Sequence, residues 1–294
     1  MDGHALGGGE LMRVYEAVAP ENLPPMRLEA YLAKALPLLP PHVLRDAFAA
    51  RDVKMNGVRV GRDTPALPGA QILVYTPFVP ELPIVYEDER LLIVNKPAGI
   101  SADADGRGGM TVLSLLAERA NGRYTPRLLH RLDNPTCGLM LLAKDDESEQ
   151  ALLRAFRERT LCKRYICLVR GEMRPPAAVK QAYLIKDAKR ARVRVVTHET
   201  PGAVPIATQY EALSFDGTLS RLRVTLLTGK THQIRAHMAF LSHPLLGDDQ
   251  YGDRALNKRL KAGGLKLCAT ELTLYTDGAL AYLNGRVFQI DAPF

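Results

Sequence analysis

From residue 84 onward, short apolar segments with the composition of β-strands follow one another with few helices between them. The clearest of them are residues 84–86, 91–94, 139–143, 165–169, 207–213 and 220–227. A doubly wound parallel sheet would need a helix after nearly every strand. The pattern therefore predicts an α+β fold with a mixed, largely antiparallel central sheet and peripheral helices and loops, among them a helix at residues 147–159.

A smaller α/β unit is predicted ahead of this region, at residues 24–76. Its expected elements are helices at 27–36 and 42–50, a hairpin turning at Asn56 and Gly57, and a strand at 71–75. Asn-Gly between short alternating runs favours a tight hairpin because both residues tolerate positive φ. Residues 1–23 are expected to be a disordered tail, 77–83 a proline-rich linker, and 84–294 the large domain.

The positive charge is unevenly distributed along the chain. The formal net charge is +7, and residues 1–80 hold as many basic as acidic side chains, so the later residues carry the whole excess. If a nucleic acid is the partner, this larger part should attract its phosphates. The cations expected to do so are Arg154, Arg157, Lys163, Lys189, Arg190, Arg192 and Arg194.

The cysteine pattern and the hydropathy favour a cytoplasmic protein. The cysteines at 137, 162, 167 and 268 form no CxxC pair, which argues against a zinc site and fits a reducing compartment. No secretory leader or apolar run of about 18 residues is found, so neither export nor membrane insertion is expected.

Two motifs invite other functions. Gly229-Lys230-Thr231 follows a strand, but a phosphate-binding loop needs Gly five positions earlier, where this chain has Val224. His232, His237 and His243 match no zinc-ligand spacing, so surface or hydrogen-bonding functions are expected for them.

Three segments carry residue types suited to chemistry. Residues 128–144 place Asp133 in a polar loop just before a glycine and an apolar strand. On its own, this pattern is more typical of a turn whose aspartate caps the backbone. Residues 163–171 form a strand containing Tyr165, and residues 227–252 place Arg235 near the start of a helix.

The combination of these segments is more specific than any one of them. In chain order, the chain contains residues 95–99 (NKPAG), 130–138 (HRLDNPTCG), 163–165 (KRY), 229–237 (GKTHQIRAH) and 243–252 (HPLLGDDQYG). This series resembles the RluA family of pseudouridine synthases. The resemblance implies the pseudouridine synthase fold and isomerisation of uridine to pseudouridine in structured RNA, without cofactor or metal.

The resemblance also implies site residues. Asp133 matches the family's catalytic aspartate, Arg235 is expected to pair with it, and Tyr165 is expected to lie against the uracil and to help remove the C5 proton. Whether the aspartate attacks covalently or removes the 2′ proton stays open.

Further residues are expected to contact RNA. Arg131 is expected to fill the space left by the flipped uridine, and His130, Lys96 and Lys163 to contribute other contacts. Residues 24–76 resemble an S4 RNA-binding module, which implies Arg27, Arg45 and Lys54 as contacts, although Arg51 stands where the module usually has glycine.

Two residues depart from the family pattern, Cys137 in place of Ser and Cys268 in place of His. Ribosomal RNA of the large subunit is the expected target and transfer RNA the alternative, with the protein acting as a monomer. The alternative hypotheses are a catalytically silent RNA-binding or ribosome-assembly factor and a hydrolase resembling glycosidases. The latter normally needs two carboxylates, and the motifs offer one.

Overall fold

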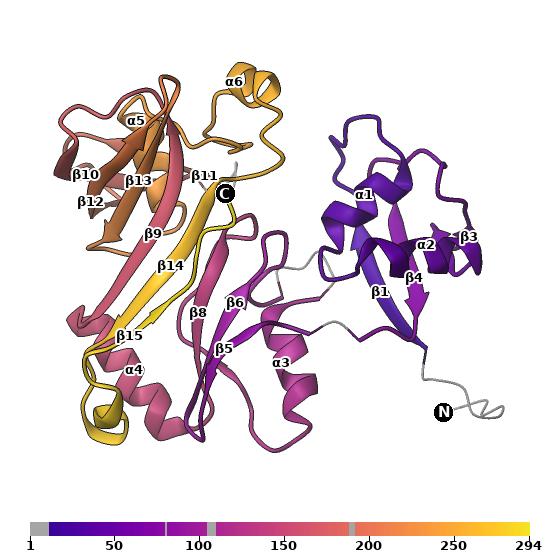
Figure 1. The fold of residues 1–294 in the computed structure, drawn as a ribbon, viewed down its shortest axis with the longest axis horizontal. Coiled ribbons are helices and arrows are strands. Elements are labelled where there is room, and N and C mark those ends of the chain that lie inside the picture. Colours follow the sequence, from indigo (N-terminus) through magenta and orange to yellow (C-terminus); the bar gives the residue numbers. More distant parts are fainter. Residues whose placement is uncertain (1–11, 80, 105–109, 188–191) are drawn as a thin grey trace. The chain divides into compact units, whose positions relative to one another are not determined.

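The computed structural model describes residues 12–79, 81–104, 110–187 and 192–294. The chain divides into two compact units (Figure 1), Met1–Leu82 with Pro97–Arg119 and Pro83–Lys96 with Ala120–Phe294. The predicted division at residues 77–83 is therefore incomplete, because Pro97–Arg119 belongs to the N-terminal unit. The glycine-rich residues 1–10 lie outside the described residues.

The N-terminal unit contains a four-stranded antiparallel sheet. Its strands are paired in the order β1 (Arg13–Val18), β4 (Gln71–Thr76), β2 (Val53–Met55) and β3 (Val58–Arg59). The helices are α1 (Leu28–Ala35), α2 (Pro41–Ala49) and α3 (Val112–Ala120). Leu28, Leu32 and Leu36 are almost fully buried, as their four-residue spacing predicts for the inner face of a helix.

The local predictions for this unit are confirmed, but the predicted tail is wrong in part. Asn56 and Gly57 both have positive φ, at 50° and 82°, in the hairpin between β2 and β3. Residues 13–18, assigned to the tail, form β1 and pair along the full length of β4. Only a partner more than 50 residues away makes this segment a strand, which explains why the local pattern missed it.

The larger unit is built on an eleven-stranded sheet. The strands are β5 (Ile84–Glu87), β6 (Leu91–Lys96), β7 (Arg127–Leu128), β8 (Cys137–Ala143), β9 (Leu161–Arg170), β10 (Ala177–Asp187), β11 (Arg192–Val196), β12 (Ala203–Phe215), β13 (Leu219–Leu226), β14 (Leu267–Leu274) and β15 (Arg286–Gln289). The main path runs β11-β10-β12-β13-β9-β14-β8-β6-β5, with β15 on β14 and β7 on β8. Within the described part of the chain, β8 and β14 are the one parallel pair, which confirms the mixed, largely antiparallel sheet.

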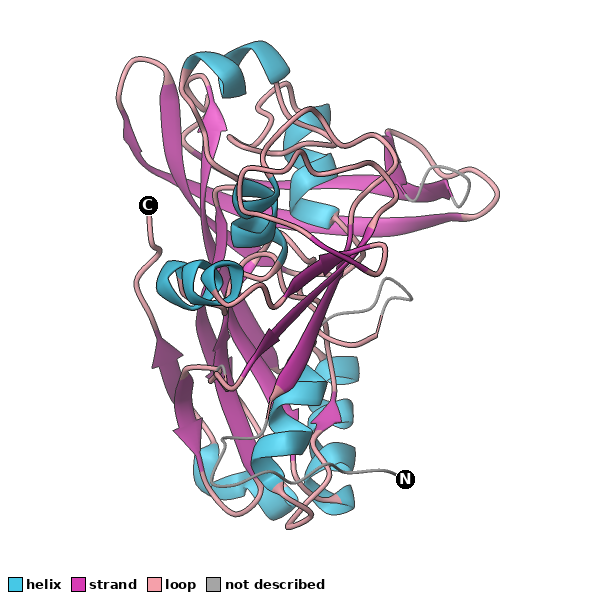
Figure 2. Ribbon diagram, turned by 90° about the vertical axis from the view of Figure 1, so that its right-hand side faces the viewer, coloured by secondary structure: helices cyan, strands magenta, loops and turns pink. Residues whose placement is uncertain are grey.

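Helices lie around this sheet (Figure 2). They are α4 (Asp146–Glu158), α5 (Gln233–Phe240), α6 (Arg254–Arg259) and the 3₁₀ helix η2 (Gly278–Leu283). Helix α4, predicted at 147–159, begins where the Asp145 carboxylate accepts a hydrogen bond from Ser148 N–H. Its residues Ala151 and Leu152 pack in one core with β8. None of the helices in the described ranges is long and apolar enough to cross a membrane.

Strand β14 was not predicted, yet it lies at the centre of the sheet between β9 and β8. At its contact with β8, a glycine is required. Gly138 has a φ of +115°, and a Cβ atom there would lie 2.3 Å from the carbonyl oxygen of Ala269. The two backbones therefore approach closely just after the loop that carries Asp133, which gives this loop a rigid support in mid-sheet.

Candidate active site

Asp133 lies in the loop between β7 and β8, with about a quarter of its side chain exposed (23%). Its backbone carbonyl accepts the turn's hydrogen bond from Thr136 N–H (2.9 Å). The neighbouring Asn134 carbonyl accepts from Lys96 Nζ (3.1 Å). Because backbone groups close the turn, the carboxylate is available to other partners, and it faces Arg235 rather than capping the loop.

Arg235, on α5, is buried and bridges several carboxylates. Its Nη1 donates to Asp133 Oδ2 at 3.2 Å, which agrees with the predicted pairing. Its bidentate contact, however, is with Asp248: Nε and Nη2 donate to the two carboxylate oxygens at 2.7 and 2.9 Å. A weaker contact of 3.3 Å reaches the exposed Asp249. The guanidinium is therefore fixed by Asp248 and presents one N–H edge to Asp133.

No function was predicted for Asp248, although it lies in the family-like segment 243–252. Its side chain is completely buried. Burial raises its pKa, but the hydrogen bonds and charge of Arg235 and the N–H groups of Gln250 and Tyr251 outweigh this, so the net shift is downward. Asp248 is thus an ionised, buried support for Arg235. Its mid-loop position gave no local signal of this pairing.

Replacing Arg235 with Lys should lower turnover by about tenfold to a hundredfold, the cost of losing one hydrogen bond to a charged group. An ammonium cannot hold both oxygens of Asp248 and also reach Asp133. The formal charge is retained, so RNA affinity should stay near that of the wild type. Steady-state rates and a binding isotherm for Arg235→Lys check this, and an unchanged turnover number would contradict the pairing.

Tyr165, on β9, is buried and lies opposite Ala269 of β14 in the strand register. Burial first, and then the negative charge of Asp133, raise its pKa. The phenol is therefore protonated at neutral pH. This favours packing against a base over removal of a proton as a phenolate.

The two residues that depart from the family pattern meet in the structure. Cys137 begins β8 and Cys268 lies opposite it in β14. The Cys137 thiol donates to the carbonyl oxygen of Leu267 at 3.6 Å. The adjacent Cys268 thiol and the positive charge of Lys96 lower the pKa of Cys137, against the effect of burial. No local pattern predicts this contact, because 130 residues lie between the two cysteines.

The predicted contacts at Lys96 and His130 need correction or restriction. Lys96 is fully buried, and burial lowers its pKa to about 8; it supports the Asp133 loop instead of an RNA surface. The Nε2 atom of His130 accepts a hydrogen bond from Leu141 N–H (3.0 Å), and burial lowers its pKa to about 3. His130 therefore has a structural function, because it binds the backbone of strand β8. A contact between His130 and RNA stays a prediction.

Two other predicted contacts in this unit differ in exposure. Arg131, next to Leu132 in the Asp133 loop, is exposed. Lys163 is half-buried, with its Nζ 5.0 Å from the centre of the Phe156 ring, and burial lowers its pKa. Of the remaining expected phosphate contacts, Lys189 and Arg190 lie outside the described residues.

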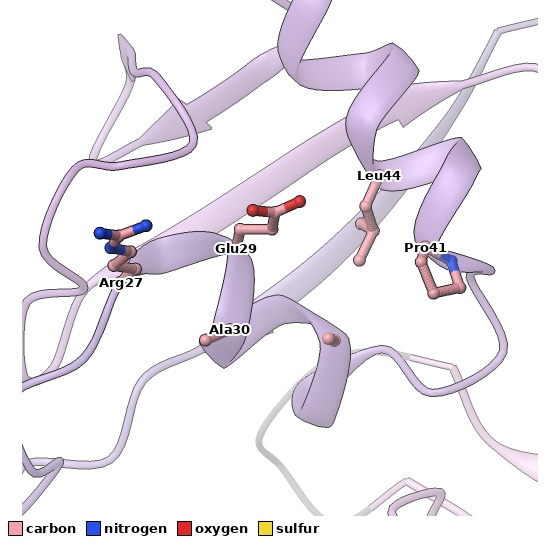
Figure 3. Close-up of a pocket in the computed structure, with 6 residues that line it drawn as sticks. Arg27, Glu29, Ala30, Pro41 and Leu44 are labelled. Atoms are coloured by element: carbon pink, nitrogen blue, oxygen red, sulfur yellow. The ribbon is translucent and has the colours of Figure 1, made fainter.

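The cations predicted for the N-terminal unit are on its surface. Arg27 is exposed and 3.1 Å from Asp63, and Arg45 is exposed. Lys54 lies over the Tyr75 ring at 5.1 Å. Figure 3 shows a pocket between α1 and α2 to which Arg27 contributes beside Glu29 and Leu44. Because a cation and an anion both line this pocket, its charge favours no particular class of ligand.

A largely antiparallel sheet that holds a loop carboxylate against a buried guanidinium defines the pseudouridine synthase class of fold and site. Residues 90–240 match the family model described as RNA pseudouridylate synthase. A human structure titled RNA Pseudouridylate Synthase Domain Containing 1 superposes with a TM-score of 0.60 at 25% identity, covering 74% of this chain and 85% of that one. The chain belongs to the RNA pseudouridylate synthase family.

Two bacterial relatives illustrate the similarity. Ribosomal large subunit pseudouridine synthase C of Haemophilus ducreyi is 35% identical over 185 residues, which cover 62% of this chain and 57% of that protein. The protein of the same name from Escherichia coli strain K12 is 33% identical over 216 residues, covering 71% of this chain and 66% of that protein. The matched region thus spans less than two thirds of either relative's length.

Proposed function

We propose that this protein is an RNA pseudouridine synthase, an isomerase that uses Asp133 as its catalytic carboxylate. The observation that carries the proposal is the contact of 3.2 Å between Arg235 Nη1 and Asp133 Oδ2, made by a guanidinium that Asp248 holds in place. A partly exposed carboxylate beside a fixed positive charge is reachable by substrate and held in place by an electrostatic partner.

The reaction breaks the N1–C1′ bond of uridine, turns the uracil within the site and joins C5 to C1′. Asp133 acts either by covalent attack or by removing the 2′ proton. Arg235 provides the carboxylate with a positively charged partner when the bound base excludes water. Arg131, exposed in the same loop, takes the place of the flipped nucleotide, whose unstacking costs a few kcal/mol.

Replacing Tyr165 with Phe should slow release of the C5 proton by about twofold to tenfold, as for loss of one neutral hydrogen bond, and leave RNA affinity unchanged. The ring that lies against the uracil is kept, and only the hydroxyl is lost. Tritium release from RNA labelled at C5 of uridine, compared with the dissociation constant, checks this. Equal release rates would exclude any function of the hydroxyl in the proton step.

The proposed substrate is large-subunit ribosomal RNA, because the bacterial relatives carry that target in their names. Transfer RNA is the second candidate. We further propose that the N-terminal unit binds RNA as an S4-like module through exposed cations such as Arg27 and Arg45, and that the protein acts as a cytoplasmic monomer.

One assay separates the proposed isomerase from its rivals. The purified protein is incubated with an unmodified large-subunit ribosomal RNA transcript tritiated at C5 of uridine. An isomerase releases tritium to water while the base stays attached to the RNA. A hydrolase would release free uracil, and a silent binding factor would release neither; either result would refute the proposal. A transfer RNA transcript tested in parallel distinguishes the two targets.

A further inference from the structure

His232 holds an unusual backbone conformation at the edge of the site. It is the N-cap of α5 and has φ 52° and ψ 19°, in the left-handed region. For a residue with a Cβ atom this region costs roughly 1 kcal/mol or more relative to the ordinary helical conformation. Glycine would adopt it without that cost, so the local backbone alone does not explain a histidine here.

The conformation directs the imidazole toward Asp133. The Nε2 atom of His232 lies 3.9 Å from Asp133 Oδ2. The opposite nitrogen, Nδ1, lies 3.0 Å from the hydroxyl of Tyr251, and the two rings are in edge contact. The histidine thus spans the distance between the candidate catalytic carboxylate and a fixed phenol.

The hydrogen bonds of Tyr251 assign the tautomer of His232. The Tyr251 oxygen accepts from Val193 N–H on β11 at 2.9 Å. Among the described residues, His232 Nδ1 is the acceptor within reach of its own O–H, at 3.0 Å, and we assign the hydrogen bond in that direction. A neutral imidazole with an accepting Nδ1 carries its hydrogen on Nε2. The N–H group therefore points at the carboxylate of Asp133.

Charged groups on all sides bear on the His232 ring. Burial and the charge of Arg235 lower its pKa, against the opposing effect of Asp133, Asp248 and Asp249. The net shift is downward, so the ring is neutral at neutral pH. A neutral donor can orient a carboxylate without cancelling the charge that it needs for catalysis.

A second hydrogen-bond donor would fix the orientation of the Asp133 carboxylate. Arg235 contacts it through Nη1 alone, at 3.2 Å, since Nε and Nη2 are engaged by Asp248 and Asp249. One hydrogen bond leaves a carboxylate free to rotate. Catalytic hydrogen bonds are often long without substrate and shorten when it binds, and a shift of about 1 Å would bring His232 to ordinary hydrogen-bond distance.

We propose that His232 is a positioning residue for Asp133, which donates its Nε2–H to the carboxylate when RNA is bound, with Tyr251 fixing the tautomer. This inference rests on the proposed isomerase function. Arg235 and His232 together would hold the carboxylate from two directions.

The test compares His232→Gly with His232→Asn and Tyr251→Phe. Glycine relieves the left-handed backbone, so His232→Gly should be at least as heat-stable as the wild type. Its kcat should nevertheless fall by about tenfold to a hundredfold, as for loss of a hydrogen bond to a charged group, with KM and RNA affinity unchanged. Added imidazole, which fits the space left by the ring, should restore part of the rate.

The other variants have graded expectations. His232→Asn tolerates the same backbone and keeps an N–H, so it should lose less activity than the glycine variant. Tyr251→Phe should reduce kcat by a smaller factor, since it removes the hydroxyl that fixes the tautomer of His232 but keeps the His232 imidazole. Asn121→Gly is the matched control, because Asn121 is also left-handed (φ 46°), is exposed and is uncharged; its rate should be that of the wild type.

The outcomes separate this inference from the proposed function. If His232→Gly keeps kcat within about twofold while Asp133→Asn is inactive, the positioning function is wrong and the isomerase proposal stands. If Asp133→Asn itself is active, the proposed function is wrong. If the glycine variant has a higher KM and a lower RNA affinity, and imidazole does not restore the rate, His232 serves RNA binding or local structure. This result also overturns the inference.

Discussion

Asp133→Asn will lower tritium release from C5-labelled RNA by at least about 10²-fold, and up to about 10⁴-fold, the range for a group that transfers protons or attacks in the transition state. The amide has the same shape but cannot act as a base or a nucleophile at this site. Because Asp133 is partly exposed and Arg235 keeps its contacts with Asp248, the variant should fold and bind RNA as the wild type does.

The control for this result is Asp277→Asn, the same chemical change at a side chain that is 84% exposed. It should keep the full rate. Thermal unfolding and an RNA-binding isotherm, measured on both variants, separate loss of chemistry from loss of structure. Normal isomerisation by a well-folded Asp133→Asn protein would remove the basis of the proposed function.

Asp248→Asn is expected to produce the largest loss of stability. The substitution leaves the buried guanidinium of Arg235 without its bidentate, negatively charged partner. Removing one member of a buried ion pair typically costs about 3–5 kcal/mol of stability. For a unit of this size that corresponds to a drop in Tm of roughly 10 °C. Turnover should fall as well, by about tenfold or more, since Arg235 would no longer be held toward Asp133.

Asp249→Asn is the matched control for stability. Both neighbouring aspartates contact Arg235, but the side chain of Asp249 is 83% exposed, whereas that of Asp248 is fully buried. An exposed pair contributes about 0–1 kcal/mol, so Asp249→Asn should unfold within about 4 °C of the wild type. Equal losses of Tm in the two variants would show that burial of the ion pair does not matter.

The stability contribution of Asp248 should depend on pH in one direction. Its pKa is lowered in the folded protein, so its contribution is fully present above the pKa of the unfolded chain, about 3.9, and is lost as the pH falls through the folded value. The difference in Tm between wild type and Asp248→Asn should therefore be full above about pH 5 and shrink below about pH 4. A difference that stays constant through this range would contradict an ionised Asp248.

Several parts of the molecule were predictable because their signals are local. The four-residue spacing of Leu28, Leu32 and Leu36, the Asn56-Gly57 turn and the apolar face of α4 each depend on residues within one or two turns of chain. The order of motifs also predicted Asp133, Tyr165 and Arg235 as site residues through the family resemblance. In the structure, Arg235 contacts Asp133 and the charge of Asp133 acts on Tyr165.

Other features depended on residues that are distant in sequence. Strand β1 became a strand through β4, and Cys137 met Cys268 through the parallel pairing of β8 and β14. Lys96 was expected to contact RNA, but it is buried and donates to the Asn134 carbonyl in the Asp133 loop.

The sequence by itself determined the family and the residue types of the site, because short motifs and periodic patterns report on near neighbours. Only the tertiary structure decided that Asp248 holds Arg235 and that His232 faces Asp133. These contacts depend on the relative positions of α5, the loop after it and the β7–β8 loop. Sheet register and side-chain packing set those positions, and no local pattern encodes them.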